Sequence, residues 1–399
     1  MHLFRIIFGF VFIGGLLSKC IVINKDLESP KDVLQSKKVS EKEMLVGMFG
    51  MHDPKDYEYL NSLGFNTVVS SVNSERLETA GDLGMNFIST CGIQYTSKDS
   101  VGNFDQAIFE FDSHPSLHSW YLVDEPAFNN IDPLLIHQAM NQLKSIGVSK
   151  PLSITSWRTD KLDFYQEFAD HIMVDRYPIP WRGVGDLGHH VRMGKLAAGP
   201  GRPVYAIVQA FSWEAFPDVI TQDFVPRSPS FAELNAMVFD AIAQGAEGII
   251  FFSYKSGNWF LPEHPALWAS TQVVVEKIKK YQEILMGQRP WVGFRQKYGD
   301  FSKRFNEFGM SSVTARFFEV QPGRPSGKFK PGLYLLAVNT TNFPQTYSIR
   351  LDAWAESETT CPASVLRLND SQEVPVKEGW LTDDFKPLHV RVYGPFATR

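Results

Sequence analysis

Apolar residues along this chain recur in short runs that alternate with stretches of helical spacing. The first run is Leu45–Phe49. Asp53 and Pro54 follow as a helix N-cap with proline in the first turn, and Gly64 stands where a left-handed C-cap would end that helix. The same succession of helix end, glycine and new apolar run returns at residues 83–86. This pattern predicts alternating strands and helices.

Eight apolar runs predict eight strands. They cover residues 45–49, 66–70, 87–91, 119–123, 152–156, 171–174, 204–208 and 248–253. Apolar runs separated by helical patterns indicate a parallel sheet, and eight such units in about 240 residues suit a (β/α)₈ TIM barrel. A doubly wound open sheet is the structural alternative. No GxGxxG follows an early strand, which weighs against a dinucleotide-binding fold.

The helix before the eighth strand has the clearest pattern. Ser230 and Glu233 form a capping box, and apolar residues from Phe231 to Ile242 line one face. Beyond residue 285 the pattern changes to strands alone, predicted over residues 312–320, 332–339, 346–351 and 388–392. The chain therefore divides into a barrel over residues 44–285 and a small β-sandwich over residues 286–399.

The N-terminus predicts export. Arg5 precedes an apolar run at residues 6–17, which suits a signal peptide and is short for a membrane span. Residues 17–20 partly resemble a lipoprotein box, with Lys19 where a small residue is usual, so lipidation at Cys20, a cleaved signal and an uncleaved anchor stay open. Residues 1–20 are thus a leader and residues 21–43 a polar tether. We expect a secreted or cell-envelope protein, with membrane attachment only through the N-terminus.

Charge and cysteine content exclude several classes of partner. The formal net charge of −5 does not suit nucleic-acid binding. The three cysteines, Cys20, Cys91 and Cys361, lie far apart without CxxC spacing, so a metal site is not expected. A disulfide between Cys91 and Cys361 is not expected either, because they fall in different predicted domains. No cofactor is implied.

In a TIM barrel the chemistry sits at the carboxyl ends of the strands. The most informative such end is the segment 120–126, Trp-Tyr-Leu-Val-Asp-Glu-Pro. Two adjacent carboxylates, Asp124 and Glu125, are costly to leave unpaired at the end of a buried strand. Nearby apolar rings would raise the pKa of a carboxyl group, as a general acid requires. The alternative is that both carboxylates form salt bridges with Arg158 or Arg176.

Residues 44–280 resemble the TIM-barrel glycoside hydrolases. In a large retaining group of these enzymes the acid/base is the Glu of an Asn-Glu-Pro at the end of the fourth strand, where this chain has Asp124-Glu125-Pro126. Residues 233–254 are similar to the last helix and strand of such enzymes. Residues 334–339 and 388–393 are similar to the β-sandwich that many of them carry. The resemblance implies that Glu125 is the proton donor.

The chain departs from this pattern at the seventh strand. The retaining enzymes carry a nucleophilic Glu there, whereas this strand ends in Gln209, and an amide cannot form the glycosyl-enzyme ester. Glu214 lies five residues further and could reach in from the loop. A standard double displacement is therefore in doubt.

Three readings stay open. In the first, the chain resembles glycoside hydrolase families 20 and 123: the substrate's 2-acetamido group is the nucleophile, Asp124 orients it, and Tyr177 or Tyr254 binds the amide oxygen. In the second, the enzyme inverts, and Asp175 activates a water between carboxyl groups about 6.5–9.5 Å apart. In the third, the barrel binds glycan without cleaving it.

The prediction is therefore an exported glycoside hydrolase acting on glycosides or polysaccharide. Its alternative is a non-catalytic carbohydrate-binding protein on a degenerate barrel. A second carboxylate near Glu125 would distinguish them, because only the enzyme needs one. Sugar rings pack their C–H faces on aromatic side chains. The residues expected to bind substrate all fall beyond predicted strands: Trp157, Tyr177, Gln209, Trp213 and Tyr254.

Overall fold

The computed structural model describes residues 43–90, 102–165, 167, 169–217, 224–322, 327–353 and 361–396, leaving out the side chains of residues 102–105. The predicted leader and its Cys20, nearly all of the tether, and Cys91 lie outside the described residues. The described helices include none that is both long and apolar enough to cross a membrane.

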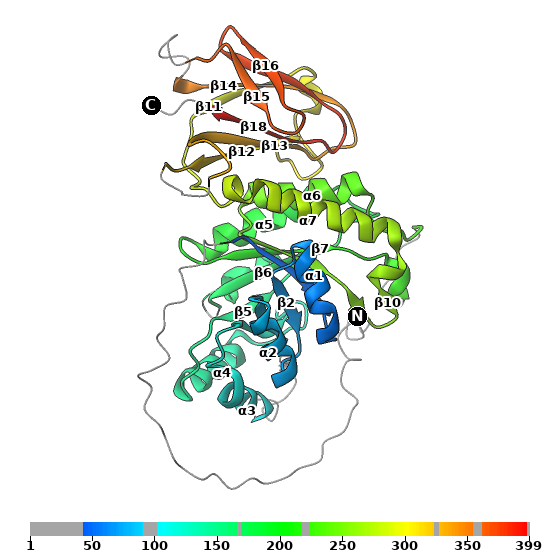
Figure 1. The fold of residues 1–399 in the computed structure, drawn as a ribbon, viewed down its shortest axis with the longest axis vertical. Coiled ribbons are helices and arrows are strands. Elements are labelled where there is room, and N and C mark those ends of the chain that lie inside the picture. Colours follow the sequence, from blue (N-terminus) through cyan, green and yellow to red (C-terminus); the bar gives the residue numbers. More distant parts are fainter. Residues whose placement is uncertain are drawn as a thin grey trace.

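Eight parallel strands close into a barrel, because β8 pairs with β1. Figure 1 shows the barrel below the C-terminal domain. The strands are β1 Leu45–Phe49, β2 Thr67–Ser70, β3 Asn86–Ser89, β4 Leu117–Asp124, β5 Leu152–Thr155, β6 His171–Arg176, β7 Val204–Gln209 and β8 Gly248–Phe252. Every predicted strand is present, with its ends within two residues of the prediction. The TIM barrel is confirmed, and the doubly wound alternative is wrong because the sheet has no open edge.

Helices surround the barrel: α1 Tyr57–Leu63, α2 Ser74–Asp82, α3 Gly102–Phe111, α4 Pro133–Ser145, α5 Gly185–Ala198, α6 Phe231–Gln244 and α7 Pro265–Leu285. The predicted end signals hold. Asp53 caps the short 3₁₀ helix η2 (Pro54–Asp56) that leads into α1, and Gly64 ends α1 with φ = 106°. The connection from β5 to β6 contains the 3₁₀ helix η4, Thr159–Phe164, where a regular unit has an α-helix.

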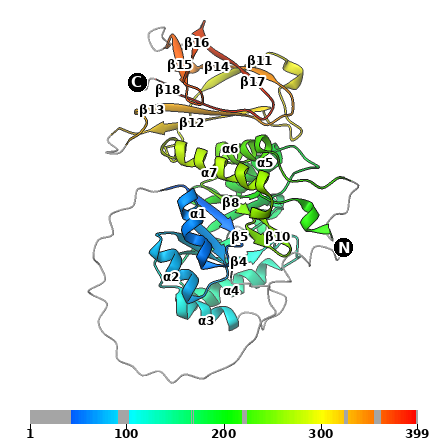
Figure 2. The same cartoon turned by 45° about the vertical axis from the view of Figure 1, so that its right-hand side comes forward.

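Helix α6 is buried on two sides. The capping box of Ser230 and Glu233 is present, and the predicted apolar face is buried except at Phe231, which is 39% exposed. The opposite face, including Phe239 and Asp240, is buried as well, because the C-terminal domain covers α5, α6 and α7 (Figures 1 and 2). Arg316 Nε of that domain donates to the Ala243 carbonyl at 2.9 Å. The two domains therefore share a packed interface.

The C-terminal domain is an antiparallel sheet of eight strands, curved into a sandwich-like form (Figure 2). Along the sheet the order is β11-β14-β17-β16-β15-β18-β13-β12. The strands are β11 Phe294–Tyr298, β12 Val313–Val320, β13 Gly332–Asn339, β14 Gln345–Leu351, β15 Ser364–Arg367, β16 Gln372–Lys377, β17 Trp380–Phe385 and β18 Val390–Phe396. The sequence predicted β12, β13, β14 and β18 but missed the other four, of which β11 and β16 are largely polar and exposed and β15 has only four residues.

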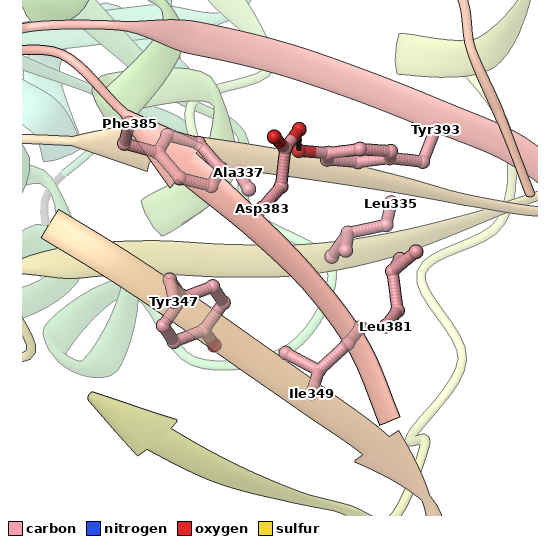
Figure 3. A pocket seen from close by; sticks show the side chains of 8 residues that line it. All are labelled: Leu335, Ala337, Tyr347, Ile349, Leu381, Asp383, Phe385 and Tyr393. Atoms are coloured by element: carbon pink, nitrogen blue, oxygen red, sulfur yellow. Dashed lines mark hydrogen bonds between the residues drawn. The ribbon is translucent and has the colours of Figure 1, made fainter. Parts of the chain in front are cut away.

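The interior of this domain contains one acidic side chain (Figure 3). Asp383 lies among apolar residues such as Leu335 and Leu381, and its Oδ2 accepts hydrogen bonds from Tyr393 Oη and Arg367 Nη1, both at 2.7 Å. The cavity beside it measures about 10 Å³, which is the lower limit for one water molecule. The cavity therefore has no room for a ligand larger than a water molecule.

Candidate active site

A β-bulge shapes the end of β4. Pairing with β5 runs from Tyr121 opposite Ser153 to Val123 opposite Ile154, so one extra residue lies in β4. In a regular strand, side chains three positions apart point to opposite faces. The bulge removes that restriction, and Tyr121 Oη donates a hydrogen bond to Asp124 Oδ1. It therefore helps to aim the acidic pair that follows.

Glu125 occupies a strained turn directly after β4. Its φ is +46°, a left-handed conformation that costs a non-glycine residue about 1–2 kcal/mol. The conformation is also unfavourable before a proline, here Pro126. Backbone strain of this kind is concentrated at functional sites. The Glu125 side chain is 8% exposed, and its Oε1 accepts a hydrogen bond from the backbone N–H of Trp157 at 2.6 Å.

The carboxyl groups of Glu125 and Asp175 lie side by side, close enough for each to shift the pKa of the other. Asp175 is the next-to-last residue of β6, so two strands meet at this contact. Glu125 Oε2 and Asp175 Oδ1 are buried without a hydrogen-bond partner. Two carboxyl groups can bond only if one is protonated. A proton on one of them would therefore bond the pair.

That proton belongs on Glu125. Burial raises the pKa of Glu125 well above its usual range, and the charge and hydrogen bond of Asp175 raise this pKa further. Burial also raises the pKa of Asp175, while the hydrogen bond from Glu125 lowers it again. Burial, then the charge of Asp175, raises the pKa of Asp124 to about 7. Burial thus raises the pKa of all three adjacent carboxyl groups, and that of Glu125 is raised well above its usual range.

The predicted salt bridges to the acidic pair do not form. Arg158 bonds to Asp160 through Nε and Nη2, and Arg176 bonds to Asp186 at 2.7 Å and 2.8 Å. Both guanidinium groups instead lie over the Trp157 ring, 5.6 Å and 5.2 Å from its centroid. The carboxyl groups therefore stay available for chemistry.

Aromatic side chains line the mouth beside the carboxyl groups. Tyr177 follows Asp175, and burial, then the charges of Asp175, Asp124 and Glu125, raises its pKa well above the usual range. Its ring lies 6.3 Å from that of Trp213, the first residue of the 3₁₀ helix η6 (Trp213–Ala215). Trp181, 37% exposed, packs on Trp213 with 4.6 Å between ring centroids. These contacts form a continuous wall from Asp175 to the surface.

Buried polar atoms without partners gather at the carboxyl ends of the strands. Besides the two carboxyl oxygens, they include the indole Nε1 atoms of Trp157 and Trp213 and the hydroxyl of Ser253. Ser253 follows β8 and is fully buried, and sequence reasoning did not select it. A buried polar group without a partner costs about 1–3 kcal/mol. A polar ligand with several hydroxyl groups could satisfy such atoms.

Gln209 has a structural role, which corrects the prediction that it binds substrate. Its Oε1 accepts from Ile179 N at 2.9 Å, and its Nε2 donates to the carbonyls of Ile179 at 2.8 Å and Phe211 at 3.3 Å. The side chain is fully buried. Both ends of the amide are occupied by the backbone, so Gln209 fixes the loop after β6. Glu214 is exposed on η6 and takes no place beside Glu125.

Tyr254 also lies away from the carboxyl groups. It hydrogen-bonds to Asp56, and its ring contacts Phe260 at 5.3 Å and Trp268 of α7 at 6.1 Å. Burial and then Asp56 raise its pKa to about 12. The prediction that Tyr254 binds substrate is therefore corrected, because its hydroxyl is directed to Asp56 near the start of α1. Of the two tyrosines proposed for the amide oxygen, Tyr177 is the one placed at the site.

The described part of the chain contains no group of three His, Cys, Asp or Glu side chains that could hold a metal ion.

Solved structures with this architecture are TIM-barrel glycoside hydrolases. An α-amylase from Anoxybacillus has a TM-score of 0.52 at 11% identity, over 88% of this chain and 97% of its own. The α-amylase of Geobacillus thermoleovorans, solved with acarbose, has a TM-score of 0.52 at 8% identity, over 88% of this chain and 97% of its own. AmyP, solved with maltose, has a TM-score of 0.52 at 9% identity, over 87% of this chain and 90% of its own. No protein-family model matches the sequence, and no curated protein does. At these identities the likeness is one of fold.

Proposed function

We propose that this protein hydrolyses O-glycosidic bonds, with Glu125 as the general acid/base. The observation that carries the proposal is the buried contact of Glu125 with Asp175 at the carboxyl ends of β4 and β6, where each group shifts the pKa of the other. Fold alone does not determine function. A carboxylic acid kept protonated near neutral pH is what cleavage of a glycosidic bond requires, because the leaving oxygen must receive a proton.

Protonation of Glu125 follows from its surroundings. The side chain is almost fully buried, and Asp175 and Asp124 both disfavour a negative charge on it. The backbone N–H of Trp157 donates a hydrogen bond to Glu125 Oε1, which fixes the orientation of the carboxyl group. When a glycosidic oxygen enters the mouth, Glu125 delivers its proton there, and the negative charges of Asp175 and Asp124 favour the positive charge that develops on the sugar. The proton returns when a water molecule completes the reaction.

The close contact between Glu125 and Asp175 favours substrate assistance over inversion. An inverting enzyme holds its two carboxyl groups about 6.5–9.5 Å apart to admit the attacking water. Carboxyl groups that lie side by side leave no such space. Gln209 is held by the backbone, so the enzyme supplies no nucleophile at the end of β7. In the mechanism we propose, the 2-acetamido group of the substrate attacks, Asp124 orients it, and Tyr177 binds its oxygen.

Carbohydrate is the substrate class that best fits the mouth. The 37% exposed ring of Trp181 offers a face for sugar C–H groups, and unpartnered indole N–H groups on Trp157 and Trp213 offer donors for hydroxyls. The non-catalytic alternative is weaker. A binding protein has no need of a second carboxyl group against Glu125, whereas here Asp175 lies beside it and Asp124 is adjacent. Export through the N-terminal segment completes the proposal.

The test is sugar release by residues 41–399 on a broad panel of chromogenic glycosides, compared with Glu125→Gln. We expect release from 2-acetamido sugars and a loss of at least about a hundredfold in the variant. Cleavage confined to sugars without the acetamido group would overturn the substrate-assisted mechanism. Specific binding of a glycan without release, unchanged in Glu125→Gln, would establish the binding protein instead.

A further inference from the structure

The loop between β6 and α5, residues 177–184, is held at both ends. Gln209 of β7 bonds to both the N–H and the carbonyl of Ile179 near the start of the loop. Gly183 near its end donates its N–H to Glu307 Oε1 of the C-terminal domain at 2.5 Å. Between these two points lies Trp181, whose ring covers Trp213. The loop therefore links the aromatic wall of the mouth to the second domain.

Glu307 stands at the tip of a rigid hairpin, residues 304–312. Asn306 N donates to the Met310 carbonyl at 2.8 Å, and Ser312 N donates to the Arg304 carbonyl at 2.8 Å. The Asn306 side chain accepts from the N–H groups of Phe308 and Met310 at 3.0 Å and 3.1 Å, and donates to Thr340 Oγ1 at 3.2 Å. These bonds fix the residues on either side of Glu307.

The hairpin also fits closely against the start of α5. A Cβ atom added to Gly185 would lie 2.7 Å from Asn306 Nδ2, so the Asn306 side chain packs directly against the backbone of Gly185. The ring of Phe308 stacks on His189, with 5.8 Å between centroids and 16° between planes. The N-cap residue of α5 is Val184, which has no side-chain acceptor. The Glu307 carboxylate supplies a negative charge at this helix N-terminus, where it is favourable.

We infer that Glu307 is a positioning residue for the active site, fixing the 177–184 loop so that Trp181 and Trp213 keep the arrangement that receives substrate. The inference rests on the proposed function. It assigns the C-terminal domain a part in the site, although no atom of Glu307 touches the reacting groups. Removal of the carboxylate frees the Gly183 N–H and loosens the loop between Ile179 and α5.

The test compares Glu307→Ala, Glu307→Gln and the control Glu373→Ala, an exposed carboxylate on β16 of the same domain. Hydrogen–deuterium exchange over residues 178–185 reports the loop directly. We expect exchange to quicken at least about tenfold in Glu307→Ala, since a hydrogen bond to a charged group is lost. Glu307→Gln keeps an oxygen acceptor and should stay within about threefold of wild type, and Glu373→Ala should match wild type.

The kinetic readout separates positioning from chemistry. In Glu307→Ala we expect KM to rise about five- to tenfold with kcat within about twofold. Unchanged exchange would overturn the inference, as would faster exchange with KM unaltered. If wild type hydrolyses no glycoside, the proposed function fails, yet exchange and acrylamide quenching of Trp181, isolated by difference against Trp181→Phe, still decide whether Glu307 fixes the loop.

Discussion

Glu125 and Asp175 come from strands two positions apart in the barrel and lie side by side in a buried contact. Neither neighbouring guanidinium group forms an ion pair with them, because Arg158 and Arg176 bond to Asp160 and Asp186, and the charge of Arg176 only lowers the pKa of Asp175. The contact explains how a carboxylic acid can stay protonated at neutral pH. It also makes Asp175 the residue that sets the acidity of Glu125.

Asp175→Asn should move the pH profile of activity. The charge of Asp175 raises the pKa of Glu125, so a neutral Asn lowers this pKa. Activity that needs protonated Glu125 is present below its pKa and lost above it. The alkaline limb of kcat/KM against pH should therefore shift to lower pH by about one unit or more. A profile identical to wild type would contradict the effect of Asp175 on the pKa of Glu125.

Gln209→Glu should destabilise the protein without creating a nucleophile. The Gln209 amide donates to the carbonyls of Ile179 and Phe211, and a carboxylate there would face both oxygens. We expect a loss of about 3–5 kcal/mol in the free energy of unfolding, measured in urea, because the new charge is buried and unpaired. A stable variant with increased activity would show that the position belongs to the catalytic machinery after all.

Trp213→Phe should weaken substrate binding and spare the fold. The Trp213 Nε1 atom is buried without a partner, so its loss costs the free protein nothing. The hydrogen bond from this indole N–H to a substrate hydroxyl would be lost, and KM should rise about five- to tenfold. Tyr254→Phe is the matched control, since its hydroxyl bonds to Asp56 rather than facing the mouth. Equal KM values for both variants would contradict this assignment.

Asp240→Asn should stabilise the protein at alkaline pH. Asp240 lies fully buried on α6, and its Oδ2 is so close to α5 that a Cβ on Gly188 would approach it to 1.9 Å. Burial raises its pKa to about 7. A raised pKa in the folded state contributes stability below the unfolded value near 4, and this contribution is lost as pH rises through 7.

The measurement is thermal unfolding of wild type and Asp240→Asn at pH 4 to 8. We expect the variant to be more stable at pH 8 by on the order of a few kcal/mol, with the difference shrinking toward pH 4. Asp82→Asn, at the exposed end of α2, serves as the control. Equal stability at every pH would contradict a buried charge at Asp240.

The hydrophobic pattern was sufficient to predict the barrel. A strand such as Val204–Gln209 is buried on both faces and therefore appears in the sequence as a continuous apolar run. The rule that chemistry lies at strand ends also selected Glu125 and Asp175. The strands β16 and β17 were missed because their exposed faces carry polar residues.

Side-chain direction at the strand ends could not be predicted. Gln209 and Tyr254 both follow strands at the correct end, yet one turns to the backbone of Ile179 and the other to Asp56. The direction of these side chains depends on the conformation of the loops after the strands, and loop sequences have no hydrophobic periodicity from which to predict it. Glu307 is 124 positions from Gly183, so nothing local in the sequence links them.

The most direct test of Glu125 as the proton donor compares leaving groups. A dinitrophenyl leaving group departs with little protonation, whereas an alkyl alcohol needs a general acid. On the sugar that wild type prefers, Glu125→Gln should lose at least about a hundredfold in kcat/KM with the alkyl glycoside and less than about tenfold with the dinitrophenyl glycoside. An equal loss with both, or no loss, would contradict proton donation by Glu125.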